Sequence, residues 1–188
     1  TIRLIAFRKG KLGELLSKGV KKAAEEVGGD ADKFAMHVKG LEMPAYDVRG
    51  LKGVGLSFAV STRGACHLRA CMYTTEMYGE WWKFHNVDRL SAKNKGFLVK
   101  FHEDFMTVYD ILGLCKFSRH IYGVEGIPEL FKAIVGREIT ISQLLTVGER
   151  TYNIERAFNV REGFSRADDT LPHRILHKAI KSGKSKGN

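Results

Sequence analysis

The chain has 188 residues, 44% of them hydrophobic, and only three prolines, which predicts a folded protein with a sizeable core rather than a disordered one. No apolar run approaches the roughly 20 residues that a membrane-spanning helix needs. No signal peptide is visible, and the first residue is Thr1 rather than Met. The net charge of +10 permits a nucleic acid or an acidic protein as partner, but we favour a solvated basic surface, because Lys and Arg are spread along the chain.

The first half of the chain shows several local patterns. Apolar residues spaced by three and four predict a helix over residues 11–27, which ends at two glycines. Alternation over residues 34–41 predicts a short strand or extended segment. The Gly-rich, apolar stretch at 50–60 favours a closely packed, buried helix, and the polar and aromatic residues 75–95 predict an irregular excursion.

The second half is dominated by helical periodicity. Residues 97–112 predict a helix with one buried face. A shorter helix over 127–136 has Pro in its first turn and Gly at its end. Thr140 and Gln143 form a capping box ahead of a helix that runs to about residue 158. The predicted fold class is therefore mainly α, a multihelical body with at most a short extended or β element.

We divide the chain into three parts. Residues 1–95 form a helical domain with a Gly-rich segment, and residues 96–176 form a second helical domain that carries the motif Asp-x-x-Gly-Leu-Cys. Residues 177–188, rich in Lys, Ser and Gly, form a flexible basic tail. The boundary near residue 95 is approximate.

The cysteines restrict the chemistry. Cys66, Cys71 and Cys115 are an odd number and include no Cys-x-x-Cys pair, which argues against a disulfide framework or a self-contained zinc site. A reducing, cytoplasmic setting fits best. Three thiols cannot supply the four ligands of an iron–sulfur cluster. If Cys115 binds a cluster, the other ligands come from elsewhere, and we expect Cys66 and Cys71 to be small buried hydrophobes.

The end of the 97–112 helix carries the pattern most suggestive of chemistry. Gly113 is suited to leave the helix in a left-handed conformation. Asp110 can accept two parallel hydrogen bonds from the N–H edge of a planar heterocycle such as a pterin or guanine. Cys115, five residues on, can ligate iron. The alternative is an exposed Asp at a helix end and a structural Cys, because this pattern alone is weakly specific.

A second candidate is the basic turn around residues 61–69. Arg63 and Arg69 suit phosphate groups, and Gly64 with the following N–H groups can form an anion-binding nest. His67 can exchange protons near neutral pH. The alternative is a basic surface turn with a hydrogen-bonded histidine.

The aromatic pair Trp81-Trp82, beside Lys83 and Phe84, allows nucleobase stacking. The alternative, which we favour, is that these aromatic side chains pack beneath a loop. The remaining histidines show no convincing metal-binding spacing with acidic residues.

Together, several blocks resemble the aldehyde:ferredoxin oxidoreductase family from about residue 5 to 176. These blocks are Gly40–Asp47, Arg49-Gly50, Gly53–Ala59, Arg63–Arg69, Asp110–Cys115, Gly148–Arg156, Arg161–Phe164 and Asp168–Pro172. The resemblance implies a multihelical fold like the C-terminal part of these enzymes. It also implies oxidation of aldehydes to carboxylic acids at a tungsten (or molybdenum) ion held by two pterins, with electrons passing through a [4Fe–4S] cluster to ferredoxin.

The same resemblance implies roles for individual residues. Asp110 resembles the aspartate that binds a pterin edge, and Cys115 resembles the fourth cluster ligand. His67 resembles the active-site histidine near the metal. The other positions expected to contact the cofactor are Arg63, Gly64, Arg69, Leu114 and Lys116.

The chain also departs from the family pattern. It lacks the N-terminal pterin-binding domain, the Cys-x-x-Cys-x-x-x-Cys block and an earlier Asp-x-x-Gly-Leu motif. We therefore expect it to act with a further N-terminal portion or a partner subunit and to be colourless and inactive alone. A non-catalytic interaction module of the same fold and, less favoured, a basic nucleic-acid-binding helical protein are the alternatives. Whether the protein forms a homodimer is left open.

Overall fold

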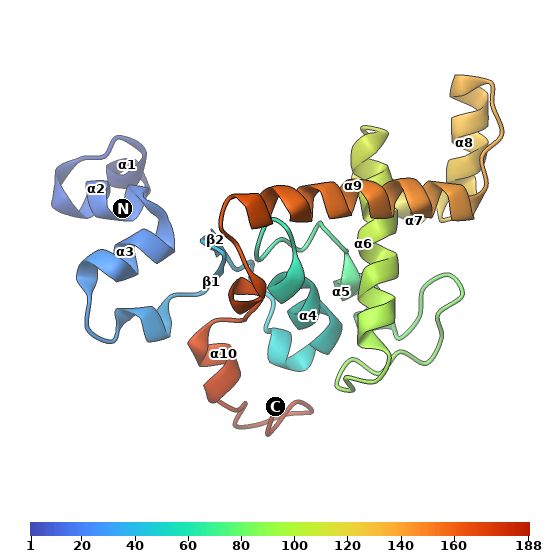
Figure 1. The fold of residues 1–188 in the computed structure, drawn as a ribbon. Coiled ribbons are helices and arrows are strands. Elements are labelled where there is room, and N and C mark those ends of the chain that lie inside the picture. Colours follow the sequence, from blue (N-terminus) through green and yellow to red (C-terminus); the bar gives the residue numbers. More distant parts are fainter.

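The computed structural model describes residues 1–188 and contains ten α-helices. The only sheet pairs β1 (His37–Val38) with β2 (Leu41–Glu42) in an antiparallel hairpin. Figure 1 shows the long helices α6 and α9 lying across each other, with the other elements arranged around them. The mainly α fold class is confirmed. No helix combines the length and the apolar character that crossing a bilayer requires.

The N-terminal helices lie to one side of the body (Figure 1). They are α1 (Ile2–Ala6), α2 (Gly10–Ser17) and α3 (Gly19–Val27). The single helix predicted over 11–27 is wrong in one respect, because the helix is interrupted at Lys18 and Gly19 has a left-handed φ of +84°. Gly28, with φ +72°, ends α3 as predicted. The amide of Val20 donates to Glu42 Oε1 at 2.8 Å and ties α3 to the hairpin.

The next helices are α4 (Lys52–Val60), α5 (Met72–Tyr78) and α6 (Lys95–Ile111). The predicted buried Gly-rich helix is confirmed as α4, whose Phe58 is fully buried. The carboxylate of Glu76 accepts hydrogen bonds from the amides of Gly53 and Val54 at 2.8 and 3.0 Å. These two amides lie in the first turn of α4 and would otherwise lack a partner within the helix. The irregular excursion predicted over 75–95 begins only after α5, at Gly79.

The remaining helices are α7 (Arg119–Tyr122), α8 (Gly126–Val135), α9 (Ile141–Arg161) and α10 (His173–His177). The capping box is confirmed, since Thr140 and Gln143 bond each other's amides at 2.9 and 3.2 Å. Gly136 ends α8 with φ +72°. Short 3₁₀ turns occur at Ala31–Phe34, Val48–Gly50, Lys116–Ser118 and Arg166–Asp168.

Helix α6 belongs to two hydrophobic clusters. Its N-terminal residues Leu98 and Val99 join the cluster around α4, whereas Phe105, Met106 and Tyr109 join a second cluster with α8 and α9. The expectation of one buried face is therefore wrong, because neighbours cover the helix on several sides. Phe97, the first residue of the stretch predicted to have a buried face, is 69% exposed.

The two predicted helical domains share this helix, since α4 packs against α6 across the proposed boundary. The boundary near residue 95 stays a prediction. The tail folds back so that the amide of Ile180 donates to the carbonyl of Asn188 at 2.9 Å. Its flexibility in solution also stays a prediction.

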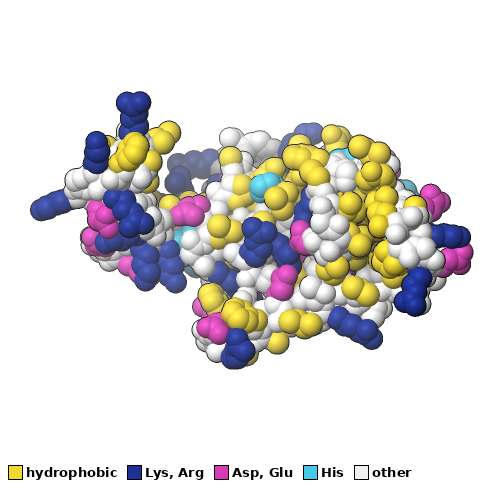
Figure 2. Space-filling model, turned by 90° about the horizontal axis from the view of Figure 1, so that it is seen from above, with side chains coloured by type: hydrophobic (Ala, Val, Ile, Leu, Met, Phe, Trp, Pro, Cys, Tyr) yellow, Lys and Arg dark blue, Asp and Glu magenta, His cyan; other side chains and the backbone are white.

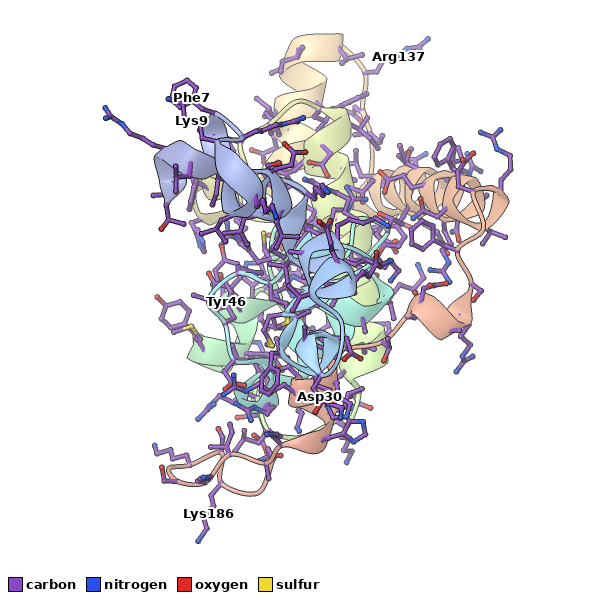
Figure 3. All side chains as sticks on the ribbon, turned by 90° about the vertical axis from the view of Figure 1, so that its left-hand side faces the viewer. Phe7, Lys9, Asp30, Tyr46, Arg137 and Lys186 are labelled. Atoms are coloured by element: carbon purple, nitrogen blue, oxygen red, sulfur yellow. The ribbon has the colours of Figure 1, made fainter.

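One face of the molecule is markedly apolar. Figure 2 shows hydrophobic side chains gathered over the part of the molecule that contains α8 and α9, whereas Lys and Arg project from the N-terminal helices. Large apolar side chains at least half exposed on these two helices are Ile134, Val135, Ile154, Phe158 and Val160. In Figure 3, Arg137 beyond α8 and Lys186 in the tail mark opposite ends of the molecule.

The backbones of α6 and α9 are in direct contact where the two helices cross, at Gly148 and Asp104. A Cβ on Gly148 would lie 2.1 Å from the carbonyl oxygen of Asp104, closer than any carbon can approach. Because the obstacle is backbone, it cannot be relieved by a side-chain rotation. The crossing therefore requires glycine at this position of α9.

We predict that Gly148→Ala lowers the free energy of unfolding by about 1–3 kcal/mol through overpacking of the α6–α9 crossing. Gly96→Ala is the matched control, because that glycine also lies in a helix and its Cβ would meet no atom within 4 Å. The control should be neutral or slightly stabilising. Urea unfolding followed by circular dichroism measures both, and an unchanged Gly148→Ala midpoint would contradict the close crossing.

Candidate functional site

Three predicted residues meet at the C-terminal end of α6. Arg69 Nη1 and Lys116 Nζ both donate to Asp110 Oδ2 at 2.8 Å. Lys116 Nζ also donates to the carbonyl of Leu68 at 2.9 Å, so it links the 61–69 segment to the end of α6. Two segments distant in sequence are thereby joined by charge-assisted hydrogen bonds.

Asp110 retains free hydrogen-bonding capacity. Its Oδ2 accepts from two cations, whereas Oδ1 accepts from no other group of the protein, and the side chain is 40% exposed. A carboxylate oxygen held in this way can accept a hydrogen bond from an N–H group of a ligand. The fixed Oδ2 and open Oδ1 thus provide one oriented acceptor.

The turn that follows leaves room beside this acceptor. Gly113 has φ +66°, as predicted, and a Cβ on it would meet no atom within 4 Å. The amide of Leu114 donates to the carbonyl of Tyr109 at 2.9 Å and closes the turn. Leu114 is half-buried and Cys115 is exposed. Backbone and thiol are therefore both approachable from outside.

Helix α9 supplies site residues that the sequence did not reveal. Arg69 is only 3% exposed, and its Nη2 donates to a carboxylate oxygen of Glu155. Thr62 Oγ1 donates to the same oxygen at 2.7 Å. The guanidinium lies 5.3 Å from the ring centroid of Tyr152, in cation–π contact. Tyr152 and Glu155 lie in the Gly148–Arg156 block of the resemblance, which carried no role for them.

A buried acid extends this network along α6. Tyr152 Oη donates to Glu103 Oε1 at 2.8 Å. Burial raises the pKa of Glu103 to about 7. Burial, followed by the nearby Glu103 carboxylate, raises the pKa of Tyr152, which keeps its hydroxyl a donor. Glu103 is thus poised to change charge near neutral pH.

His67 lies in an aromatic setting apart from the Asp110 hydrogen bonds. Its ring centroid is 5.6 Å from that of Tyr46 and 5.9 Å from that of Tyr73. Figure 3 labels Tyr46, which stacks on Tyr73 of α5. Partial burial, then the charge of Arg119, lowers the pKa of His67. The imidazole is therefore neutral at pH 7 and can accept a proton.

Arg63 and Gly64 play different structural parts. Arg63 is exposed, and only its backbone amide is bonded, to Ser61 Oγ at 3.2 Å. Gly64 is buried with φ +92°, and a Cβ there would lie 2.2 Å from the carbonyl oxygen of Val38. Glycine is therefore required for the loop to pack on β1. Whether either residue contacts a cofactor stays a prediction.

The thiols do not assemble a metal site within this chain. Cys66 and Cys71 are buried, as predicted, and burial raises the pKa of the Cys71 thiol. No group of three or more His, Cys, Asp or Glu side chains is placed to hold a metal ion. Cys115 is exposed on the turn after α6, and its role as a cluster ligand stays a prediction.

The tryptophans have a packing role. Trp82 stacks on Phe101 with ring centroids 5.1 Å apart, and Trp81 contacts Phe105 at 5.6 Å. Both rings are half-buried. The favoured alternative, packing beneath a loop, is therefore confirmed.

Comparison with known proteins identifies the family. The profile described as "Aldehyde ferredoxin oxidoreductase, domains 2 & 3" matches residues 1–188. The chain belongs to the aldehyde ferredoxin oxidoreductase family. It is 38% and 37% identical to tungsten-containing aldehyde ferredoxin oxidoreductases of Pyrococcus furiosus and Thermococcus kodakarensis, and each match covers the whole chain.

The chain spans only about 30% of the length of these two relatives. It is also 28% identical to an "Aliphatic sulfonate oxidoreductase, WOR-like subunit" of Pyrococcus furiosus, over 99% of this chain and 28% of that protein. The family resemblance found in the sequence is confirmed.

We predict that Glu103→Gln removes a pH dependence of stability. In the folded protein the pKa of Glu103 is about 7, above its ordinary value of 4.5. The folded state therefore binds the proton more tightly, and the stability that Glu103 contributes is lost as pH rises through 7. Between pH 5 and 8, the unfolding free energy of the variant should rise by about 2 kcal/mol relative to that of the native protein.

Urea unfolding at several pH values measures this difference. Glu162→Gln, at an exposed carboxylate, is the control and should leave the pH dependence unchanged. Parallel curves for Glu103→Gln and the native protein would contradict the assignment.

Proposed function

We propose that this chain is the C-terminal part of an oxidoreductase that oxidises aldehydes to carboxylic acids and contributes directly to its cofactor site. The observation that carries the proposal is the open Oδ1 of Asp110 beside the left-handed Gly113, two residues before the exposed Cys115. Because the chain belongs to this family, we interpret the arrangement as a cofactor contact. The coverage of relatives supports a further portion of the enzyme outside these 188 residues.

The residues at the end of α6 fit the edge of a pterin. Asp110 Oδ1 would accept from a ring N–H, and Lys116 and Arg69 hold the carboxylate in place. Leu114, half-buried on the turn, would contact the ring system. When bound, the bis-pterin tungsten or molybdenum centre supplies the two-electron redox chemistry of the reaction.

His67 is the proposed proton-handling residue. Its pKa is lowered, so it is a neutral base at pH 7. Tyr46 and Tyr73 restrict the ring. It would orient an aldehyde carbonyl or take up a proton released during oxidation. Arg63 and Gly64, with Arg69, are the remaining proposed cofactor-contacting positions.

Cys115 is the proposed cluster ligand. Its thiol is exposed in a turn that also carries Lys116 and its hydrogen bond to Asp110. Cys115 would thus hold a [4Fe–4S] cluster, which when bound would supply the electron-transfer chemistry toward ferredoxin. The other ligands would come from the portion outside this chain. The net charge of +10 favours an acidic electron-transfer partner.

The apolar face over α8 and α9 supports the same view. Large apolar side chains that gather on one face are typical of a surface that another protein portion covers. We propose that the remaining portion of the enzyme, or a partner subunit, covers part of it. The unpaired cysteines suit the cytoplasm as the compartment.

The decisive experiment is metal and pterin analysis of the longer protein or complex that contains this chain, purified from its source without oxygen. We expect tungsten or molybdenum, about four iron atoms per complex, and aldehyde-dependent reduction of ferredoxin. A metal-free complex without this activity would contradict the proposal and favour a non-catalytic module. The isolated chain should be colourless, and iron–sulfur absorbance from it would contradict its single-ligand role.

We predict that Cys115→Ser in the complete enzyme abolishes transfer of electrons to ferredoxin and lowers iron content, because one thiolate ligand is removed. Cys71→Ser is the matched control, since this thiol is 1% exposed and packed in the core. The control should keep its iron while losing about 1–3 kcal/mol of stability through a buried hydroxyl. Iron analysis and electron paramagnetic resonance distinguish the two variants, and a normal cluster in Cys115→Ser would refute the assignment.

A further inference from the structure

One face of α9 holds the candidate site together from outside. Tyr152, Glu155 and Asn159 are spaced by three and four residues and so share that face. Tyr152 donates to Glu103 of α6, and Glu155 accepts from Arg69 and Thr62. Asn159 Nδ2 donates to the carbonyl of Thr62 at 2.7 Å. This face therefore bonds to α6 and to the 61–69 segment at once.

The charges in this cluster are balanced. Two cations, Arg69 and Lys116, face two carboxylates, Asp110 and Glu155. Arg69 divides its guanidinium between the carboxylates, with Nη1 on Asp110 and Nη2 on Glu155. Because Arg69 is 3% exposed, it cannot replace a lost partner with bulk water. Its Nε is already buried without a partner.

An arginine and a carboxylate with no other partners frequently form two parallel hydrogen bonds. Asp110 accepts only one hydrogen bond from Arg69, because Nη2 is taken by Glu155. That division is what leaves Oδ1 of Asp110 without a partner. If Nη2 were released, Arg69 could turn toward Asp110 and engage both of its oxygens.

We propose that Glu155 is a positioning residue that acts through Arg69 to keep Oδ1 of Asp110 open for the N–H edge of a bound heterocycle. This inference rests on the proposed function, in which that heterocycle is a pterin. Glu155 itself need not touch the cofactor. Thr62, which donates to the same Glu155 oxygen at 2.7 Å, helps to hold the carboxylate in place.

The test compares Glu155→Ala with Glu149→Ala in the complete enzyme, because alanine leaves no acceptor for the cation that each carboxylate binds. Both are α9 carboxylates that pair with a cation, Glu149 with Lys100 of α6 at 3.1 Å, but only Glu155 shares a cation with Asp110. In Glu155→Ala, metal–pterin should be lost about 10–100-fold faster during dialysis, the factor that one charge-assisted hydrogen bond is worth. Glu149→Ala should retain metal–pterin like the native enzyme.

A second variant separates positioning from general destabilisation. Glutamine at position 155 keeps an acceptor for Arg69 Nη2 and Thr62 Oγ1. Glu155→Gln should therefore retain metal–pterin much better than Glu155→Ala. If Glu155→Gln loses metal–pterin as fast as Glu155→Ala, the positioning role is refuted.

A crystal structure of Glu155→Ala gives a readout that is independent of the cofactor. We expect Arg69 to donate two hydrogen bonds to Asp110 in the variant. An unmoved guanidinium, together with native retention of metal–pterin, would overturn the inference while leaving the proposed function intact. A native enzyme that contains no metal–pterin would instead overturn the proposed function, and the Arg69 position in the variant would still decide the geometric claim.

Discussion

The structure depends on the close crossing of α6 and α9 at Gly148. The backbones meet there because the glycine leaves no side chain between α9 and the carbonyl of Asp104. That approach places Tyr152 within hydrogen-bonding distance of Glu103 and Glu155 within reach of Arg69. A backbone contact between two helices thus fixes the arrangement of charges at the end of α6.

The ion pairs among Arg69, Lys116, Asp110 and Glu155 restrain the positions of the two carboxylates. A buried arginine that is shared by Asp110 and Glu155 holds both carboxylates, and Lys116 adds a second donor to Asp110. The same interactions join the 61–69 segment, α6 and α9. In this account the chain contributes one oriented acceptor, one exposed thiol and one neutral imidazole, each from a different part of the fold. The proposed function takes the remaining ligands and walls from outside this chain, in keeping with its span of about 30% of its relatives' length.

Features encoded locally were predictable from the sequence. The capping box at Thr140, the left-handed Gly113 and the buried α4 each follow from residues within one or two turns. The break at Lys18 was missed, because the apolar pattern of 11–27 continues through it. The partnership of Arg69 and Glu155 joins residues 86 apart. No local pattern encodes such a contact, and the family resemblance covered the block without giving Glu155 a role.

The most direct test of the account is an experimental structure of the complete enzyme, purified without oxygen. The account predicts Asp110 Oδ1 within about 3 Å of a pterin N–H and the thiolate of Cys115 bound to iron. Arg69 should remain divided between Asp110 and Glu155. A structure in which Asp110 faces solvent, or in which Cys115 points away from any cluster, would contradict it.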